Sequence, residues 1–303
     1  MLLIQALFKS VSCNVVFLID FDNTHQIQLH NMKIIKLTML SVLLAIASCG
    51  NPNPETKEIA ETSETTEAQR EFYQLKIYSM SSEEQVATVD AYLKNAFMPA
   101  VKKQGVDKVG VFKSRPSETD TVQKTFVLLP FESLEQFQEL DTELLKDSTY
   151  TAAGTAYIDG NYDNPPYDRI QSILLKAFPD MPQMETPDLD SPRSNRVYEL
   201  RSYESSTEKY YRNKVDMFNA GGEIPLFDRL DFQAVFYGEV ISGANMPNLM
   251  YMTTHADMDT RNEHWDAFVN SPEWKELIAM PKYENNMSHI DMWFLYPTEY
   301  SDY

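Results

Sequence analysis

One pattern of aromatic and apolar residues occurs twice in this chain, and its parts keep the same order. The stretch FYQLKIYSM matches VYELRSYES, so that Tyr73 and Leu75 correspond to Tyr198 and Leu200, 125 positions later. Further along, FMPAVKKQGVDKVGVF echoes EIPLFDRLDFQAVF, and RIQSILLKAFP echoes HIDMWFLYP. Because three separate matches keep their order, the sequence indicates a duplicated domain.

Each copy predicts the same series of secondary-structure elements. Alternating apolar residues predict strands, and helical patterns follow the first and the third strand of each copy. The resulting series, β-α-β-β-α-β, is that of the ferredoxin-like fold. We expect a first repeat at 71–178, a proline-rich linker at 179–195 and a second repeat at 196–303. Since one such sheet leaves a face uncovered, we predict an α+β fold in which both repeats form a pseudo-dimeric α/β barrel within one chain.

Two motifs of the second copy carry a family resemblance. The segment YELRSY (198–203), together with HWDAFVNSPEW (264–274), resembles the NIPSNAP family of dimeric α/β-barrel domains. The resemblance covers residues 196–296 well and residues 71–178 weakly, because the first copy has YQLKIY and lacks the Ser-Pro-Glu-Trp turn. The wider superfamily contains monooxygenases, haem-handling proteins and domains without known catalysis. The resemblance therefore implies a fold and leaves the activity open.

The N-terminal region has the features of a secretory signal. From Met32 the chain reads MKIIKLTMLSVLLAIASC, with a basic start, an apolar run and small residues before Cys49. The apolar run is short for a bilayer span, which needs about 20 residues, and it fits a signal peptide. The ending IASC resembles the lipobox of bacterial lipoproteins, which implies lipidation of Cys49 and cleavage before it. An ordinary signal peptide or an uncleaved anchor is the alternative.

This interpretation assigns the first 70 residues to targeting. Residues 1–48 are then an upstream segment and a lipoprotein signal peptide, with translation starting at Met32. Residues 49–70 are polar and contain proline, which predicts a flexible tether. Because two acyl chains on one residue anchor a protein stably, the expected partner is the membrane. The expected location is the bacterial cell envelope, on its periplasmic or extracellular face.

Composition excludes several classes of function. The net charge is −19 and no basic patch stands out, which argues against nucleic acid as a partner. The two cysteines, Cys13 and Cys49, both lie near the N-terminus. The predicted domains therefore have no disulfide, no catalytic thiol and no cysteine-ligated metal. No nucleophile elbow, phosphate loop or dinucleotide fingerprint is present.

The candidate site lies on the first strand of each repeat. If Leu200 packs under the helices, the alternate residues Glu199, Arg201 and Tyr203 line the barrel interior. Their counterparts Lys76 and Tyr78 would join them there. Such an interior would suit a small ligand, with Arg201 holding a carboxylate in bidentate fashion. The alternative is a structural Glu–Arg pair that ties the sheets together, since inward charges usually pair.

The remaining chemistry-bearing residues lie in the second repeat. All three histidines and all three tryptophans of residues 50–303 are found there. His289 shares strand parity with Asp291, so we include it as a ligand-binding candidate. Because no recognised metal-ligand spacing surrounds it, we predict neither a metal nor another cofactor.

We expect non-catalytic binding of a small ligand or a protein partner as the main function. A barrel-type oxidoreductase or monooxygenase, or a haem-handling protein, is the second hypothesis and would use Tyr203, His289 or Arg201. A structural envelope protein is the third.

Overall fold

The computed structural model of the protein describes residues 69–115 and 122–303. The predicted upstream segment, signal peptide, lipidation site Cys49 and nearly all of the tether therefore lie outside the described residues.

Eight antiparallel strands of the described region close into one barrel, in the order β1-β3-β2-β8-β5-β7-β6-β4. Each half has the ferredoxin-like strand order, β4-β1-β3-β2 and β8-β5-β7-β6, and the halves join through β2–β8 and β4–β6. The predicted fold class, a pseudo-dimeric α/β barrel within one chain, is confirmed. The strands are β1 (Phe72–Met80), β2 (Gly110–Ser114), β3 (Gln123–Phe131), β4 (Arg169–Ala177), β5 (Val197–Glu204), β6 (Phe236–Ser242), β7 (Asn248–His255) and β8 (His289–Pro297).

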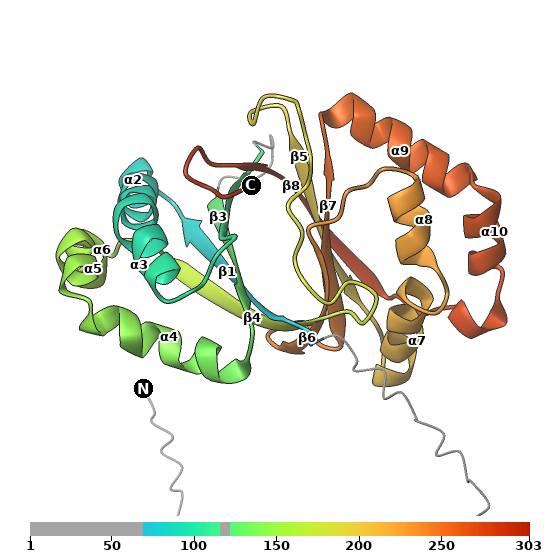
Figure 1. The fold of residues 1–303 in the computed structure, drawn as a ribbon, viewed down its shortest axis with the longest axis horizontal. Coiled ribbons are helices and arrows are strands. Elements are labelled where there is room, and N and C mark those ends of the chain that lie inside the picture. Colours follow the sequence, from blue (N-terminus) through green and yellow to red (C-terminus); the bar gives the residue numbers. More distant parts are fainter. Residues whose placement is uncertain (1–68, 116–121) are drawn as a thin grey trace, which may run out of the picture. The chain divides into compact units, whose positions relative to one another are not determined.

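Helices cover the outside of the barrel on two opposite flanks, one flank for each half of the chain (Figure 1). The longer helices begin after a Ser, Thr or Asp whose side-chain oxygen accepts a backbone N–H, namely Ser82, Ser133, Thr207 and Asp257. The helices of the first half are α2 (Glu83–Tyr92), a π-helical turn (Leu93–Phe97), α3 (Met98–Lys103), α4 (Leu134–Lys146), α5 (Ser148–Ala153) and α6 (Thr155–Ile158). Those of the second half are α7 (Glu208–Phe218), α8 (Glu223–Arg229), α9 (Met258–Asn270), α10 (Pro272–Ile278) and a 3₁₀ turn (Pro281–Tyr283).

The core of the described residues has four separate apolar clusters. One lies inside the barrel and draws Leu75 and Leu200 from the two halves. Two others lie between sheet and helices, around Leu129 in the first half and around Tyr251 in the second, and a small fourth cluster around Leu277 joins helices of the second half. Most strands are therefore covered on both faces, and in β7 all eight residues are buried. Such strands read as continuous apolar runs, which hides the distinction between their two faces in the sequence.

The segment 179–195 covers one end of the barrel. Its Met184 is buried in the interior cluster with Tyr73 and the C-terminal Tyr303. The Met184 amide donates a hydrogen bond of 2.8 Å to the Glu71 carboxylate, which holds the segment against the start of β1. This segment, expected as a linker, thus also contributes to the core, and the barrel is filled at this end.

Candidate functional site

The opposite end of the barrel holds a cavity of about 610 Å³. Its floor is apolar and consists of inward-facing side chains of five strands. They come from β1, β3 and β4 of the first half and from β7 and β8 of the second. Both halves are therefore required to form the cavity, whose size is in the usual range for small-molecule sites. The floor residues are Ile77, Phe126, Ile173, Met250 and Trp293.

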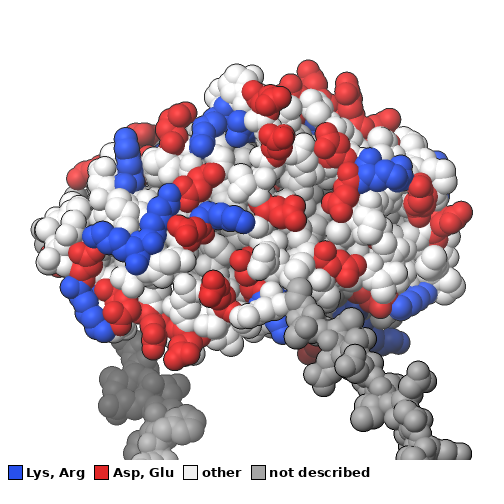
Figure 2. All heavy atoms as spheres, viewed as in Figure 1, with Lys and Arg blue, Asp and Glu red and all other residues white. Residues whose placement is uncertain are grey.

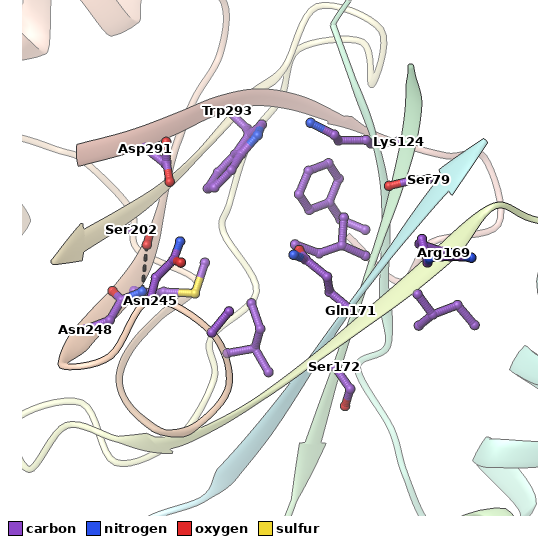
Figure 3. Close-up of a pocket in the computed structure, with 16 residues that line it drawn as sticks. Ser79, Lys124, Arg169, Gln171, Ser172, Ser202, Asn245, Asn248, Asp291 and Trp293 are labelled. Atoms are coloured by element: carbon purple, nitrogen blue, oxygen red, sulfur yellow. Dashed lines mark hydrogen bonds between the residues drawn. The ribbon is translucent and has the colours of Figure 1, made fainter. Parts of the chain in front are cut away.

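The rim of the cavity is polar. Lys124 and Arg169 lie on the first half, whereas Asn245 and Asp291 lie on the second, and Figure 3 shows them around the same space. The amide of Asn248 donates a hydrogen bond of 2.8 Å to the Ser202 hydroxyl, which fixes two polar side chains of the wall. An apolar floor below a rim with both amide and charged groups suits an amphipathic molecule.

Strand alternation explains why polarity changes along the barrel. On β1, Leu75, Ile77 and Ser79 point inward in turn, from the filled end toward the cavity. On β5, Leu200 is followed inward by Ser202. The inward-facing residues of these strands are thus apolar near the filled end and polar at the cavity end. This change is the reason why the cavity has a polar rim.

The structure overturns the predicted interior placement of Glu199, Arg201 and Tyr203. Tyr198 and Leu200 belong to the cluster inside the barrel, and Tyr203 belongs to the cluster under the helices of the second half. The strand therefore has the opposite orientation to the one expected. The physical reason is that both faces of β5 are buried, so its apolar alternation fits either orientation.

Glu199 is the centre of a buried ion cluster between β5 and α9. Its side chain is fully buried, and Arg261 contacts both carboxylate oxygens at 2.7 and 2.9 Å. The Nε of Arg201 donates to the same carboxylate at 2.6 Å, and the indole N–H of Trp265 donates at 2.9 Å. The carboxylate thus receives donors from its own strand and from the helix above, so this Glu–Arg cluster joins β5 to α9 and does not tie one sheet to the other.

The electrostatics of this cluster favour the ionised carboxylate. Burial alone would raise the pKa of Glu199, but the hydrogen bond from Arg261 and the charges of Arg201 and Arg261 outweigh it and lower the pKa. Arg201 also lies 3.7 Å from the Trp265 ring centre and donates to the Tyr203 hydroxyl at 2.8 Å. The arginine proposed as a carboxylate clamp is therefore already engaged with Glu199 and Tyr203.

The counterparts in the first half lie in the same layer, and the described residues form no matching ion cluster around them. The Lys76 ammonium lies 5.3 Å from the Phe97 ring centre, and burial lowers its pKa. The Tyr78 hydroxyl accepts a hydrogen bond of 3.3 Å from Tyr157 under the helices. Lys76 and Tyr78 are therefore also on the helix side of the sheet and do not line the cavity.

Of the predicted residues, His289 lies nearest to the cavity. Its imidazole is 58% exposed at the start of β8, and its Nε2 lies 3.2 Å from the Asp291 carboxylate, which lines the cavity. The other two histidines of the described residues have different surroundings. His255 is buried and faces the partly exposed His264, with their Nδ1 atoms 3.0 Å apart, and burial lowers the pKa of His255 to about 3.

Sequence reasoning missed most of the cavity. Lys124, Gln171 and Asn245 come from strand ends and a hairpin that are distant in the chain, and none belongs to a motif. A usable signal was present on β1, where Ser79 follows Leu75 and Ile77 on the same face. When the inward-facing residues of a strand change from apolar to polar toward one end, that change indicates that this end of the barrel is not filled.

The surface carries charges of both signs. On the face in Figure 2, acidic side chains lie over both halves with Lys and Arg between them. Among the helices of the described residues, none is both long and apolar enough to cross a bilayer.

Comparisons with known proteins give one family match and several similar solved structures. The NIPSNAP family model matches residues 198–302. A NIPSNAP-like domain protein from Burkholderia xenovorans has 16% identity and a TM-score of 0.33, covering 36% of this chain and 90% of its own. A Lactobacillus acidophilus protein provisionally called a monooxygenase has 12% identity and a TM-score of 0.48, covering 75% and 94%. A protein provisionally called a chlorite dismutase has 8% identity and a TM-score of 0.42, covering 77% and 97%.

A comparison with curated protein sequences gives no match. The family match includes β5 with Glu199, the helices of the second half and β8 with His289. The second half of this eight-stranded barrel matches the NIPSNAP family model over residues 198–302.

Proposed function

We propose that this protein binds a small amphipathic molecule in the cavity without converting it. The observation that carries the proposal is the cavity of about 610 Å³, with an apolar floor and a polar rim built by both halves of the barrel. The other end of the barrel is filled by Met184 and Tyr303, so a ligand would enter and leave at the rim. Turnover of a bound compound would instead support the oxidoreductase alternative.

The rim indicates the polar part of the ligand. Lys124 and Arg169 lie on one side of the cavity, and Asp291 lies on the other. An anionic group would be attracted to the first side, while an alkyl or aromatic body would contact Phe126 and Trp293 on the floor. A medium-chain carboxylate such as decanoate has both parts and serves as the test ligand.

Filling the cavity is expected to abolish binding of decanoate. In Ser79→Trp, the indole would occupy the space between floor and rim, so calorimetric titration should show no binding where the wild-type chain shows one site. The matched control is Ser148→Trp, on the exposed N-terminal end of α5. Equal affinity in Ser79→Trp and wild type, with both folded by circular dichroism, would refute the assignment.

We further propose that Cys49 is lipidated and anchors the protein in the bacterial cell envelope, with residues 49–70 as the tether. The support is the run of basic, apolar and small residues that ends at Cys49. Cys49→Ser should move the protein from the membrane fraction to the soluble fraction and remove the mass of the acyl chains. Ser63→Ala in the tether is the control and should stay in the membrane. An unchanged distribution of Cys49→Ser would refute the anchor.

A further inference from the structure

We propose that Glu204, His289 and Asp291 form a binding site for a divalent transition-metal ion at the edge of the cavity. One potential ligand atom from each residue lies within 4.8 Å of the other two. The three residues belong to neighbouring strands, and only Asp291 is also part of the cavity wall. The site stands independently of the proposed ligand binding, because it needs no occupant in the cavity.

Strand register brings the three residues together. Glu204 on β5 lies directly opposite His289 on β8, and Asp291 lies two positions further along β8, opposite Ser202. Residues opposite each other, and residues two apart on one strand, project from the same face of a sheet. The three side chains therefore leave the sheet on the face that also bears Ser202, at the end of the barrel that holds the cavity.

The spacing suits a first-row metal ion. His289 Nε2 and Asp291 Oδ1 are 3.2 Å apart, and the Glu204 carboxylate lies within 4.8 Å of both groups. Ligands at about 2.0–2.2 Å from zinc are roughly 3–4 Å from each other. Because His289 and Asp291 are partly exposed at 58% and 39%, small side-chain rotations can bring the third ligand into range.

The donor set indicates the class of metal. One imidazole nitrogen and two carboxylates suit Zn²⁺, Co²⁺, Fe²⁺ or Mn²⁺, whereas Ca²⁺ and Mg²⁺ prefer oxygen ligands only. Three protein ligands leave at least one coordination position of such an ion vacant. Since Asp291 lines the cavity, a bound ion would lie beside the cavity rim. The competing explanation is an ordinary exposed His–Asp ion pair, which would bind no metal.

Cobalt provides a direct test, because its visible absorption reports its ligands. The full chain carrying Cys13→Ser and Cys49→Ser, which excludes thiolate ligands, is titrated with Co²⁺ and then with Zn²⁺. We expect one site, displacement of Co²⁺ by Zn²⁺, and no competition from a large excess of Mg²⁺. Removing a group that hydrogen-bonds a metal ligand costs about 10–100-fold in metal affinity. Removing a ligand itself, as in His289→Ala or Asp291→Asn, should therefore lower the affinity for Co²⁺ by at least about 100-fold.

Matched substitutions separate this site from other donors. His264→Ala removes a histidine of α9, and Asp188→Asn removes an exposed carboxylate of segment 179–195; both should retain the cobalt spectrum. Circular dichroism without metal checks that each variant is folded. The proposal is overturned if wild type binds no Co²⁺, if His289→Ala and Asp291→Asn both bind it as wild type does, or if Mg²⁺ competes equally.

Discussion

Replacing Glu199 by alanine is expected to lower the free energy of unfolding by about 3–5 kcal/mol, because breaking a buried ion pair leaves an uncompensated charge. Here two cations lose their common partner: Arg201 and Arg261, whose side chains are only 12% and 16% exposed. The Trp265 indole N–H loses its acceptor as well. Urea unfolding monitored by circular dichroism measures the change.

The first half supplies the control for this substitution. Gln74 is the counterpart of Glu199, and its side chain makes an exposed hydrogen bond to Ser172. Gln74→Ala should therefore cost about 1 kcal/mol or less. Similar losses in Gln74→Ala and Glu199→Ala would show that the ion cluster contributes no more than an ordinary surface contact.

The pH dependence of Glu199 has a defined sign. Its pKa in the folded state is lowered from the ordinary 4.5, so the unfolded chain binds the proton more readily. The stabilisation from the charged carboxylate is present above pH 4.5 and is lost as the pH falls below it through the folded pKa. The stability difference between wild type and Glu199→Gln should therefore shrink in acid. A difference that stays constant from pH 7 to pH 3 would contradict this.

Lys214→Met is expected to cause the other large loss, again about 3–5 kcal/mol. Lys214 on α7 and Glu223 on α8 are 4% and 2% exposed, and their charged atoms lie 2.9 Å apart. Methionine has a similar length and fills the space, so the loss isolates the unpaired carboxylate. The control is Lys146→Met, which breaks an exposed pair with Glu143 and should cost about 1 kcal/mol at most.

A double substitution and the pH dependence test the cause of this loss. Burial raises the pKa of Glu223 above its ordinary 4.5, although Lys214 partly opposes the rise. In Lys214→Met, the contribution of Glu223 to stability should therefore be most favourable below pH 4.5, where this carboxyl is protonated in both states, and should fall as the pH rises through the folded pKa. Lys214→Met with Glu223→Leu should regain most of the loss, since an apolar pair can replace a buried ion pair. No recovery in the double variant would point to lost packing instead.

The sequence predicted the fold class because its strongest signals repeat. The matching strands around Tyr73 and Tyr198, each followed by a helix and two more strands, were sufficient to expect two ferredoxin-like sheets in one barrel. The structure has the same strand order in both halves. That the halves arose by duplication remains a prediction from the sequence alone.

The candidate site was less predictable because barrel strands are buried on both sides. For β5, placing Leu200 inward or outward gives equally apolar surroundings, and the choice decides where Glu199 and Arg201 lie. One clue lay in α9, where Arg261 and Trp265 are four residues apart and so share a helix face. Both donate to Glu199, which shows that a polar helix face can identify the polar face of the strand beneath it.

The location of a bound ligand tests the central claim most directly. With ¹³C-labelled methyl groups, nuclear Overhauser effects from decanoate to the full chain would identify the contacted residues. We predict contacts to Ile77, Ile173 and Met250 on the cavity floor, and none to Ile224 or Leu226, which belong to α8 and pack in the cluster between sheet and helices. Contacts to Ile224 and Leu226 without contacts to the floor would place the ligand between sheet and helices and contradict the account.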